Sequence, residues 1–293
     1  MKILFIGTVL FSFKTLEKLI YMHSNIVGVC TKQQSNFNSD FKNLVPICKT
    51  SNIPFKLTED INSEDTIEWI KQLKPDIIFC FGWSSLIKKE LLDLAPMGVV
   101  GYHPAFLPQN RGRHPLIWAL VLGLKKSAST FFFMEEGADD GDILSQVKFD
   151  ILYDDDAQIL YNKVIDVALK QMEEFIPQLE SGIYQRIKQN HELANTWRKR
   201  SRLDGLIDFR MSSIAIYNLV RGLTKPYIGA NILYNNKDVI FWKVEVIDVD
   251  LPNIEYGKVL EIENNTILIK TFDTAIRVLE HTFDVLPEVG EYL

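Results

Sequence analysis

The chain has 293 residues, of which 47% are hydrophobic and 24% charged, a composition that predicts a folded globular protein with one large and one small domain. Its formal net charge of −6 makes nucleic acid an unlikely partner, and no apolar run approaches the ~20 residues that span a bilayer. Three widely spaced cysteines predict buried free thiols rather than a metal site, and with no signal peptide at the N-terminus they favour a cytoplasmic location.

The first half of the chain alternates between strand-like and helical patterns. Apolar runs predict strands at 2–6, 25–30, 76–81 and 98–102, and helical patterns fall near 11–21, 41–51, 64–73 and 84–94. Two further strands, 127–134 and 144–149, and a long amphipathic helix, 157–181, follow. This order predicts an α/β domain with a doubly wound, mostly parallel sheet.

The composition changes after residue 183. A polar, basic stretch predicts a surface linker at 184–204, between a larger domain at 1–183 and a smaller domain at 205–293. That smaller domain has one predicted helix, 211–223, and five short strands, at 228–234, 239–247, 256–263, 266–271 and 274–283. Short strands joined by tight turns, such as Asn235-Asn236 and Asn264-Asn265, predict a small barrel or sandwich.

Residues 98–115 contain the first candidate site. An apolar run places His103 at the end of a predicted strand, before a loop with proline and glycine, and open α/β sheets bind ligands at such strand ends. An acidic loop at 135–142 follows the next strand. A histidine beside a carboxylate would form an oriented general base, for which Asp139 is the favoured partner and Asp140 the competitor.

Five motifs in order resemble the folate-dependent formyltransferase family, whose members act on methionyl-tRNA, glycinamide ribonucleotide and amino sugars. The motifs are Met1–Thr8, Phe81–Ile87, His103–Gly112, Glu136–Asp142 and Ile216–Ala230. The resemblance implies a Rossmann-like catalytic domain and a C-terminal barrel similar to an oligonucleotide-binding (OB) fold. It also implies transfer of a formyl group from 10-formyltetrahydrofolate to an amine, without a metal ion.

The resemblance also implies roles for individual residues. His103 matches the family's catalytic base and Asp139 the carboxylate that orients it. The pterin of the folate would lie against the two loops that contain Phe81, Trp83, Leu86, Ile87, Phe133, Glu136 and Asp142.

One position departs from the family pattern. The family has an asparagine two residues before the histidine, and its amide binds the oxyanion, whereas this chain has Gly101. Loss of one oxyanion donor typically lowers turnover by ~10²–10³-fold. A backbone N–H, Gln109 or His114 could replace the amide, the glycine could make room for a different transferred group, or the domain could be a non-catalytic binder.

The acceptor is predicted from the run Arg111-Gly-Arg113-His-Pro, which resembles the amino-sugar branch of the family. This implies a nucleotide-linked amino sugar as substrate, as in cell-surface polysaccharide biosynthesis, with Tyr102, Arg111, Arg113 and Lys225 as candidate binding residues. Methionyl-tRNA formylation and binding of folate or nucleotide sugar without turnover are the rival functions. The C-terminal domain would contribute to substrate binding or to a homodimer.

Overall fold

The computed structural model describes residues 1–35 and 39–293, and it divides the chain into two compact units. The first unit comprises residues 1–112, 127–149 and 162–197, and the second comprises 113–126, 150–161 and 198–293. Each unit is described by itself below. These units follow spatial contacts rather than chain order, so the continuous domain boundaries expected from the sequence stay a prediction.

The first unit contains a seven-stranded sheet in the order β3-β2-β1-β4-β5-β7-β8. Strands β1 (Lys2–Ile6), β2 (Asn25–Thr31), β3 (Phe55–Leu57), β4 (Ile77–Cys80) and β5 (Val99–His103) are parallel, whereas β7 (Lys126–Phe133) runs antiparallel to β5. Strand β8 (Ile143–Asp150) forms the edge beside β7. The predicted α/β class and mostly parallel sheet are confirmed, while the short strand β3 was not predicted.

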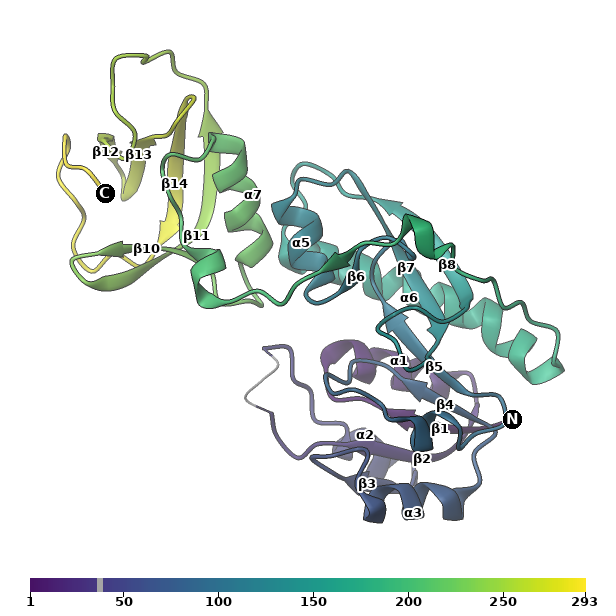
Figure 1. Cartoon of the computed structure of the whole chain (residues 1–293). Coiled ribbons are helices and arrows are strands. Elements are labelled where there is room, and N and C mark those ends of the chain that lie inside the picture. Colours follow the sequence, from purple (N-terminus) through teal and green to yellow (C-terminus); the bar gives the residue numbers. More distant parts are fainter. Residues whose placement is uncertain (36–38) are drawn as a thin grey trace. The chain divides into compact units, whose positions relative to one another are not determined.

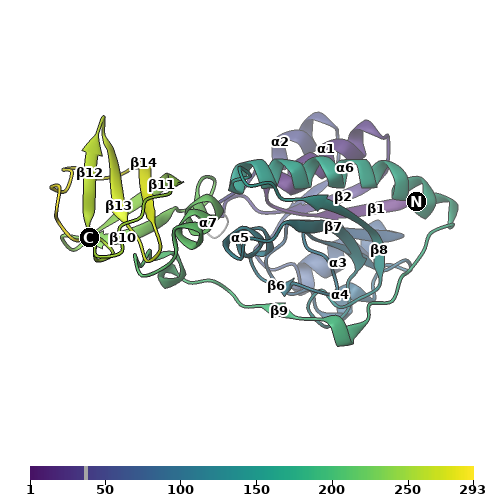
Figure 2. The ribbon, with the colours of Figure 1, turned by 90° about the horizontal axis from the view of Figure 1, so that it is seen from above.

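Helices cover both faces of this sheet (Figures 1 and 2). Helices α1 (Leu10–Tyr21) and α6 (Ala157–Ser181) lie on one face, and α3 (Glu64–Leu73) and α4 (Lys89–Leu92) on the other. Helix α2 (Val45–Thr50) is shorter than the predicted 41–51. The predicted helix 84–94 is wrong except for α4, because the side chain of Asn62 bonds the carbonyl of Leu86 and the N–H of Lys88.

Aromatic rings pack the centre of the sheet against α6. The Phe81 ring lies 5.2 Å from the rings of both Phe79 and Phe131, and Phe175 of α6 lies 4.8 Å from Phe131. All four rings are buried. The three cysteines are also buried and free, as predicted, and burial raises the pKa of each thiol. These thiols therefore belong to the core rather than to a reactive site.

The second unit contains an antiparallel sheet in the order β10-β11-β14-β13-β12. Its strands are β10 (Ala230–Tyr234), β11 (Lys237–Ile247), β12 (Val259–Glu263), β13 (Thr266–Lys270) and β14 (Ala275–His281). The predicted turns at 235–236 and 264–265 are confirmed, since all four asparagines have positive φ. In the described chain β10 and β12 are the two edges of an open sheet, so a closed OB-like barrel is not confirmed.

Two helices of the second unit pack together, α5 (Pro115–Val121) and α7 (Ser213–Leu223). Arg221 of α7 is only 6% exposed, and burial lowers the pKa of its guanidinium. Its Nη1 donates to the backbone carbonyls of Leu152, Tyr153 and Asp155 over 2.9–3.0 Å. This one side chain therefore fixes the segment before α6 to α7.

We expect Arg221→Met to lower the free energy of unfolding by about 3 kcal/mol, because it breaks three charge-assisted hydrogen bonds, among them the buried bond to the Asp155 carbonyl. Urea denaturation measures this change. Arg210→Met is the matched control: Arg210 is exposed and pairs with Asp208, so its loss should cost at most about 1 kcal/mol. Equal losses for the two variants would contradict the assigned role of Arg221.

Candidate active site

Strand β5 positions the first catalytic candidate. Val99 and Val100 are buried, and the strand ends at His103, at the carboxyl edge of the parallel part of the sheet. Side chains alternate along a strand, so position 101 and His103 share one face and Tyr102 faces the other. The face that carries His103 is therefore also the face where the family's asparagine side chain would stand.

The imidazole of His103 has a defined hydrogen-bonding state. Its Nε2 lies 2.7 Å from the carbonyl oxygen of Asn110. Because a carbonyl only accepts, Nε2 carries the proton and the lone pair of neutral His103 resides on Nδ1. That atom faces Asp139 Oδ2 at 3.6 Å. A proton taken up at Nδ1 would thus create an imidazolium between a carbonyl and a carboxylate.

Asp139 is held in place from both sides. Its backbone has a positive φ of 55°, which is uncommon for a residue with a side chain. The N–H of Gly112 donates to its Oδ2 over 2.9 Å, and the Gln189 amide donates to its backbone carbonyl, also over 2.9 Å. The side chain of Asp139 is 20% exposed and that of His103 only 6%, so Asp139 is the more accessible member of the pair. The structure thus brings His103 to Asp139, the favoured of the two predicted carboxylates.

The space beside Gly101 is filled. A Cβ atom built on Gly101 would lie 2.8 Å from Met134 Cγ, 3.0 Å from its Sδ and 3.1 Å from Phe132 Cζ. Phe132 is the cross-strand partner of Gly101, and the Met134 N–H bonds the Val99 carbonyl. A thioether and a phenyl ring therefore occupy the volume that the glycine was expected to open for a different transferred group.

A polar segment that was predicted to belong to the linker packs against both the loop that follows His103 and the acidic loop at 135–142. We call residues 187–197 the strap; it belongs to the first unit. Strand β6 (Arg111–Gly112) pairs with β9 (Thr196–Trp197) inside the strap, where a Cβ on Gly112 would lie 2.3 Å from the Trp197 carbonyl. The sequence holds no clear signal for this role, because a short polar stretch with few apolar residues has the pattern of an exposed loop.

The residues predicted to lie near the pterin differ in their surroundings. Phe81, Ile87 and Phe133 are buried, Leu86 is exposed, and Glu136 pairs with Lys89 at 3.6 Å. The Asp142 carbonyl accepts the Phe133 N–H. The indole N–H of Trp83 is buried and finds no hydrogen-bond partner among the described residues, which fits a loop that completes its polar contacts with a ligand. Folate binding at these residues stays a prediction.

The predicted substrate-binding residues belong to both units, Tyr102 and Arg111 to the first. Tyr102 stacks on Phe11 at 4.1 Å and its hydroxyl lies 2.9 Å from Ser129 Oγ, so it packs on the face opposite His103. Arg111 is 9% exposed and its Nη2 donates to Gln189. Packing thus accounts for both side chains, and their binding of substrate stays a prediction.

Arg113 and Lys225 are exposed residues of the second unit, and Lys225 lies over the Trp242 ring at 5.5 Å.

His114, one candidate replacement for the missing amide, also belongs to the second unit. Its Nε2 is buried with no hydrogen-bond partner in the part of the chain that the structure describes, and burial, followed by the charges of Arg113, Arg200 and Lys199, lowers its pKa. Gln109, the other side-chain candidate, is an exposed residue of the first unit. These roles stay predictions too.

Over the ranges that the structure describes, no group of three or more His, Cys, Asp or Glu side chains is arranged to hold a metal ion. Within the same ranges, no helix is both long and apolar enough to cross a membrane.

A doubly wound sheet with a histidine–carboxylate pair at a strand end is the arrangement of an α/β enzyme, because such folds bind ligands at strand ends and a positioned histidine can serve as a general base. Residues 1–176 match the formyl transferase family, and residues 200–285 match the formyl transferase C-terminal domain. The chain therefore belongs to the formyl transferase family, and the resemblance stated from its motifs is confirmed.

Relatives of both acceptor types are similar to this chain. A methionyl-tRNA formyltransferase of Clostridioides difficile (strain 630) is 28% identical over 299 residues, covering 100% of this chain and 96% of that protein. The N-formyltransferase from Helicobacter canadensis, solved with folinic acid and dTDP-3-aminofucose, shares the fold with a TM-score of 0.73 and 19% identity over 95% of this chain and 98% of that one. The sugar 3N-formyl transferase WlaRD was solved in the presence of dTDP and 5-N-formyl-THF. It shares the fold with a TM-score of 0.72 and 18% identity, over 97% of this chain and 99% of that one.

Proposed function

We propose that this enzyme transfers a formyl group from 10-formyltetrahydrofolate to the amine of a nucleotide-linked amino sugar. The observation that carries the proposal is the His103–Asp139 pair at the end of β5, with 3.6 Å between Nδ1 and Oδ2. Bound 10-formyltetrahydrofolate supplies the activated formyl group. Binding, orientation and proton transfer then fall to the residues of the chain.

Of the two residues in the pair, Asp139 is the first to contact the amine. A sugar amine arrives as an ammonium, and the more exposed member of the pair is the carboxylate, which attracts the positive charge. His103 Nδ1 takes the proton that must leave the nitrogen before or as it attacks. The resulting imidazolium is stabilised by the Asn110 carbonyl at Nε2 and by Asp139 at Nδ1. As the bond between the formyl carbon and N10 of the donor breaks, His103 returns this proton to N10 and tetrahydrofolate leaves. The second proton lost by the amine nitrogen goes to solvent. Because Gly101 has no side-chain donor, we assign oxyanion stabilisation to backbone N–H groups of the two loops.

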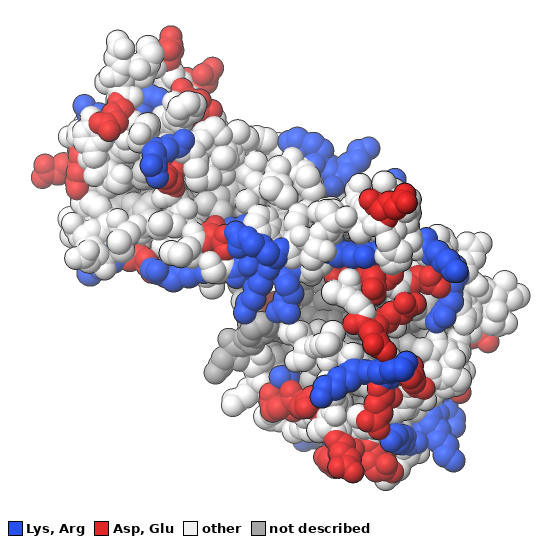
Figure 3. All heavy atoms as spheres, in the orientation of Figure 1, with Lys and Arg blue, Asp and Glu red and all other residues white. Residues whose placement is uncertain are grey.

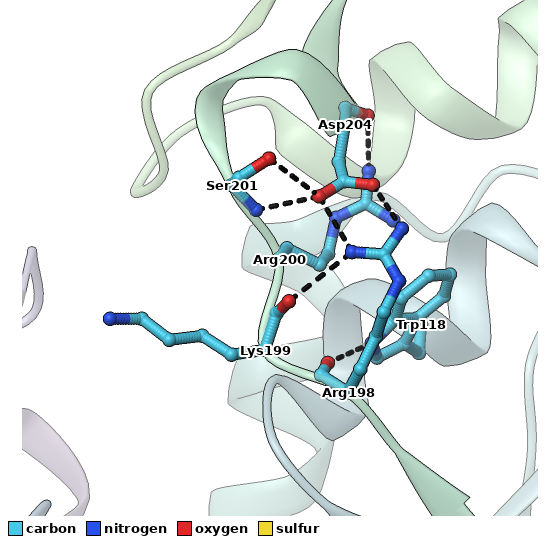
Figure 4. A network of polar contacts seen from close by, with 6 residues as sticks. All are labelled: Trp118, Arg198, Lys199, Arg200, Ser201 and Asp204. Carbon is cyan, nitrogen blue, oxygen red and sulfur yellow. Dashed lines mark hydrogen bonds and ion pairs between the residues drawn. The ribbon is translucent and has the colours of Figure 1, made fainter.

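The internal pairing of the most basic segment favours a small acceptor over tRNA. Arg198 donates two guanidinium N–H groups to the Asp204 carboxylate, and Arg200 donates to the Asp204 backbone carbonyl while lying over the Trp118 ring at 4.6 Å (Figure 4). Arg202 pairs with Asp238. These guanidinium groups already have partners inside the second unit, which leaves less of their charge for a phosphate backbone.

The surface drawn in Figure 3 carries Lys and Arg side chains interspersed with Asp and Glu. One of its several blue groups lies over the segment between β9 and α7, the part of the sequence that contains the arginines just described. A diphosphate needs only one or two basic side chains and a few backbone N–H groups. Such a surface fits that requirement better than an extended polyanion.

Methionyl-tRNA formylation is the second candidate function, because methionyl-tRNA formyltransferases are similar over the full chain. The deciding assay supplies 10-formyltetrahydrofolate with either dTDP-3-aminofucose and related nucleotide-linked amino sugars or methionyl-tRNA. Formylation of a nucleotide sugar supports the proposal, whereas formylation of methionyl-tRNA alone would replace it. Calorimetric binding of 5-formyltetrahydrofolate and of the sugars without turnover would instead indicate a non-catalytic binder.

We expect Asp139→Asn to lower turnover at least about tenfold while leaving the affinity for 5-formyltetrahydrofolate nearly unchanged. The amide oxygen of the substituted side chain can still accept the Gly112 N–H, so the change removes mainly the negative charge beside His103. Steady-state kinetics and calorimetry measure the two quantities. Asp140→Asn is the matched control, and a larger loss there would transfer the role to Asp140.

A further inference from the structure

We propose that Gln189 is a positioning residue for the catalytic carboxylate, acting from the strap through the two loops that hold His103 and Asp139. The side chain of Gln189 is buried, with 6% of the residue exposed. Its Nε2 donates to the backbone carbonyls of Asp139 and Gly141, over 2.9 Å and 2.7 Å. Its Oε1 accepts a 2.7 Å hydrogen bond from Arg111 Nη2. One amide therefore joins the acidic loop to the loop that follows His103.

The loop on the other side of Gln189 orients both catalytic side chains. Directly before Arg111, the carbonyl of Asn110 bonds His103 Nε2. Directly after it, the N–H of Gly112 donates to the carboxylate of Asp139. Arg111 is thus flanked by the two backbone groups that orient the catalytic pair, and Gln189 fixes Arg111 relative to the backbone of Asp139.

The rest of the strap fixes the same two loops. Its residue Ile187 exchanges two backbone hydrogen bonds with Ile143, the first residue of β8. Asn195 accepts the N–H of Asn110 with its side chain and the N–H of Arg111 with its backbone carbonyl. His191 Nδ1 lies 3.2 Å from Arg111 Nη2.

Among these contacts, Gln189 supplies the side-chain link to the residue that bears the carboxylate. Asp139 has a left-handed backbone conformation that costs free energy, and such a conformation persists only where its surroundings fix it. The two N–H donors of Gln189 bond the carbonyls on either side of Asp140. We infer that without them the acidic loop relaxes, and the 3.6 Å approach of Asp139 to His103 is lost.

Gln189→Glu separates this role from simple packing. The glutamate has almost the same shape and would form an ion pair with Arg111, but an ionised carboxylate has no N–H to donate to Asp139 and Gly141. Gln178→Glu, on an exposed position of α6, is the control for the added negative charge. Should the buried glutamate prevent folding, Gln189→Met keeps the side-chain volume and removes all three hydrogen bonds.

The first measurement does not depend on turnover. Hydrogen-exchange mass spectrometry should show faster exchange in peptides covering 110–114 and 138–143 of Gln189→Glu, with β1 and β4 unchanged and with 5-formyltetrahydrofolate still bound. Wild-type exchange in both loops would overturn the proposal. Because this result is independent of the acceptor, it stands or falls separately from the proposed function.

The second measurement rests on the proposed function. With the acceptor that supports turnover, Gln189→Glu should lower kcat by about 10–100-fold, since a displacement of about 1 Å in a reacting group can have that effect. In an Asp139→Asn background the same change should lower kcat little further, because both substitutions act through one carboxylate. Fully multiplicative losses in the double variant, or wild-type kcat in Gln189→Glu, would overturn the positioning role.

Discussion

Replacing His103 with asparagine is expected to lower the rate of formyl transfer by about 10²–10⁴-fold, the range that a positioned general base contributes. The ring meets the Asn110 carbonyl through Nε2 and the Asp139 carboxylate through Nδ1, so its loss leaves the attacking amine without a proton acceptor. The fold should survive, because a shorter polar side chain can still reach a nearby backbone group. Single-turnover kinetics with the formyl donor in excess would measure the chemical step directly.

The matched control is His23→Asn, at an exposed position just after α1 with a positive φ that asparagine tolerates. Its rate should equal that of the wild type. If His103→Asn retained more than about a tenth of the wild-type rate, the proton would have to leave by another route. Asp139, the accessible carboxylate of the pair, would then be the base to test.

Restoring the family's amide is expected to have the second large effect, but only when Met134 is shortened at the same time. Gly101→Asn alone forces a Cβ to within 2.8 Å of Met134 Cγ, so either that side chain or the strand must shift. In the double variant Gly101→Asn/Met134→Ala, the amide gains the space that the thioether now fills. We expect this variant to transfer formyl at least tenfold faster than the wild type, towards the ~10²–10³-fold that one oxyanion donor contributes.

Two single variants complete this test. Met134→Ala alone should gain no activity and should lose stability, because it leaves a cavity beside Phe132. Gly101→Asn alone should fall below the double variant in both rate and stability. A double variant that binds 5-formyltetrahydrofolate normally yet transfers formyl no faster than the wild type would show that a missing donor does not limit this enzyme. The backbone N–H groups assigned above would then supply all the oxyanion stabilisation that this enzyme needs.

Much of the fold was predictable because its signals are local. Apolar runs and helical periodicity identified β1, β2, β4, β5 and the helices α1, α3 and α6, and paired asparagines marked the hairpin turns of the second unit. The helix predicted at 84–94 failed for a non-local reason: the side chain of Asn62 bonds the backbone at 86 and 88. Periodicity along a chain contains no information about such a distant competitor.

The sequence by itself determined the family, the class of reaction and the candidate base, because the order and spacing of the five motifs are readable along the chain. Only the tertiary structure decided that Asp139 rather than Asp140 approaches His103, that Met134 fills the space beside Gly101, and that Gln189 joins the two catalytic loops. Each of these facts depends on contacts between residues far apart in the chain. Gln189, for example, lies 50 positions from Asp139 and 78 positions from Arg111. Such contacts form only when β5, β7 and the strap come together at the end of the sheet. The hydrogen-bond partners of a polar residue in a polar stretch can be identified only from the folded structure.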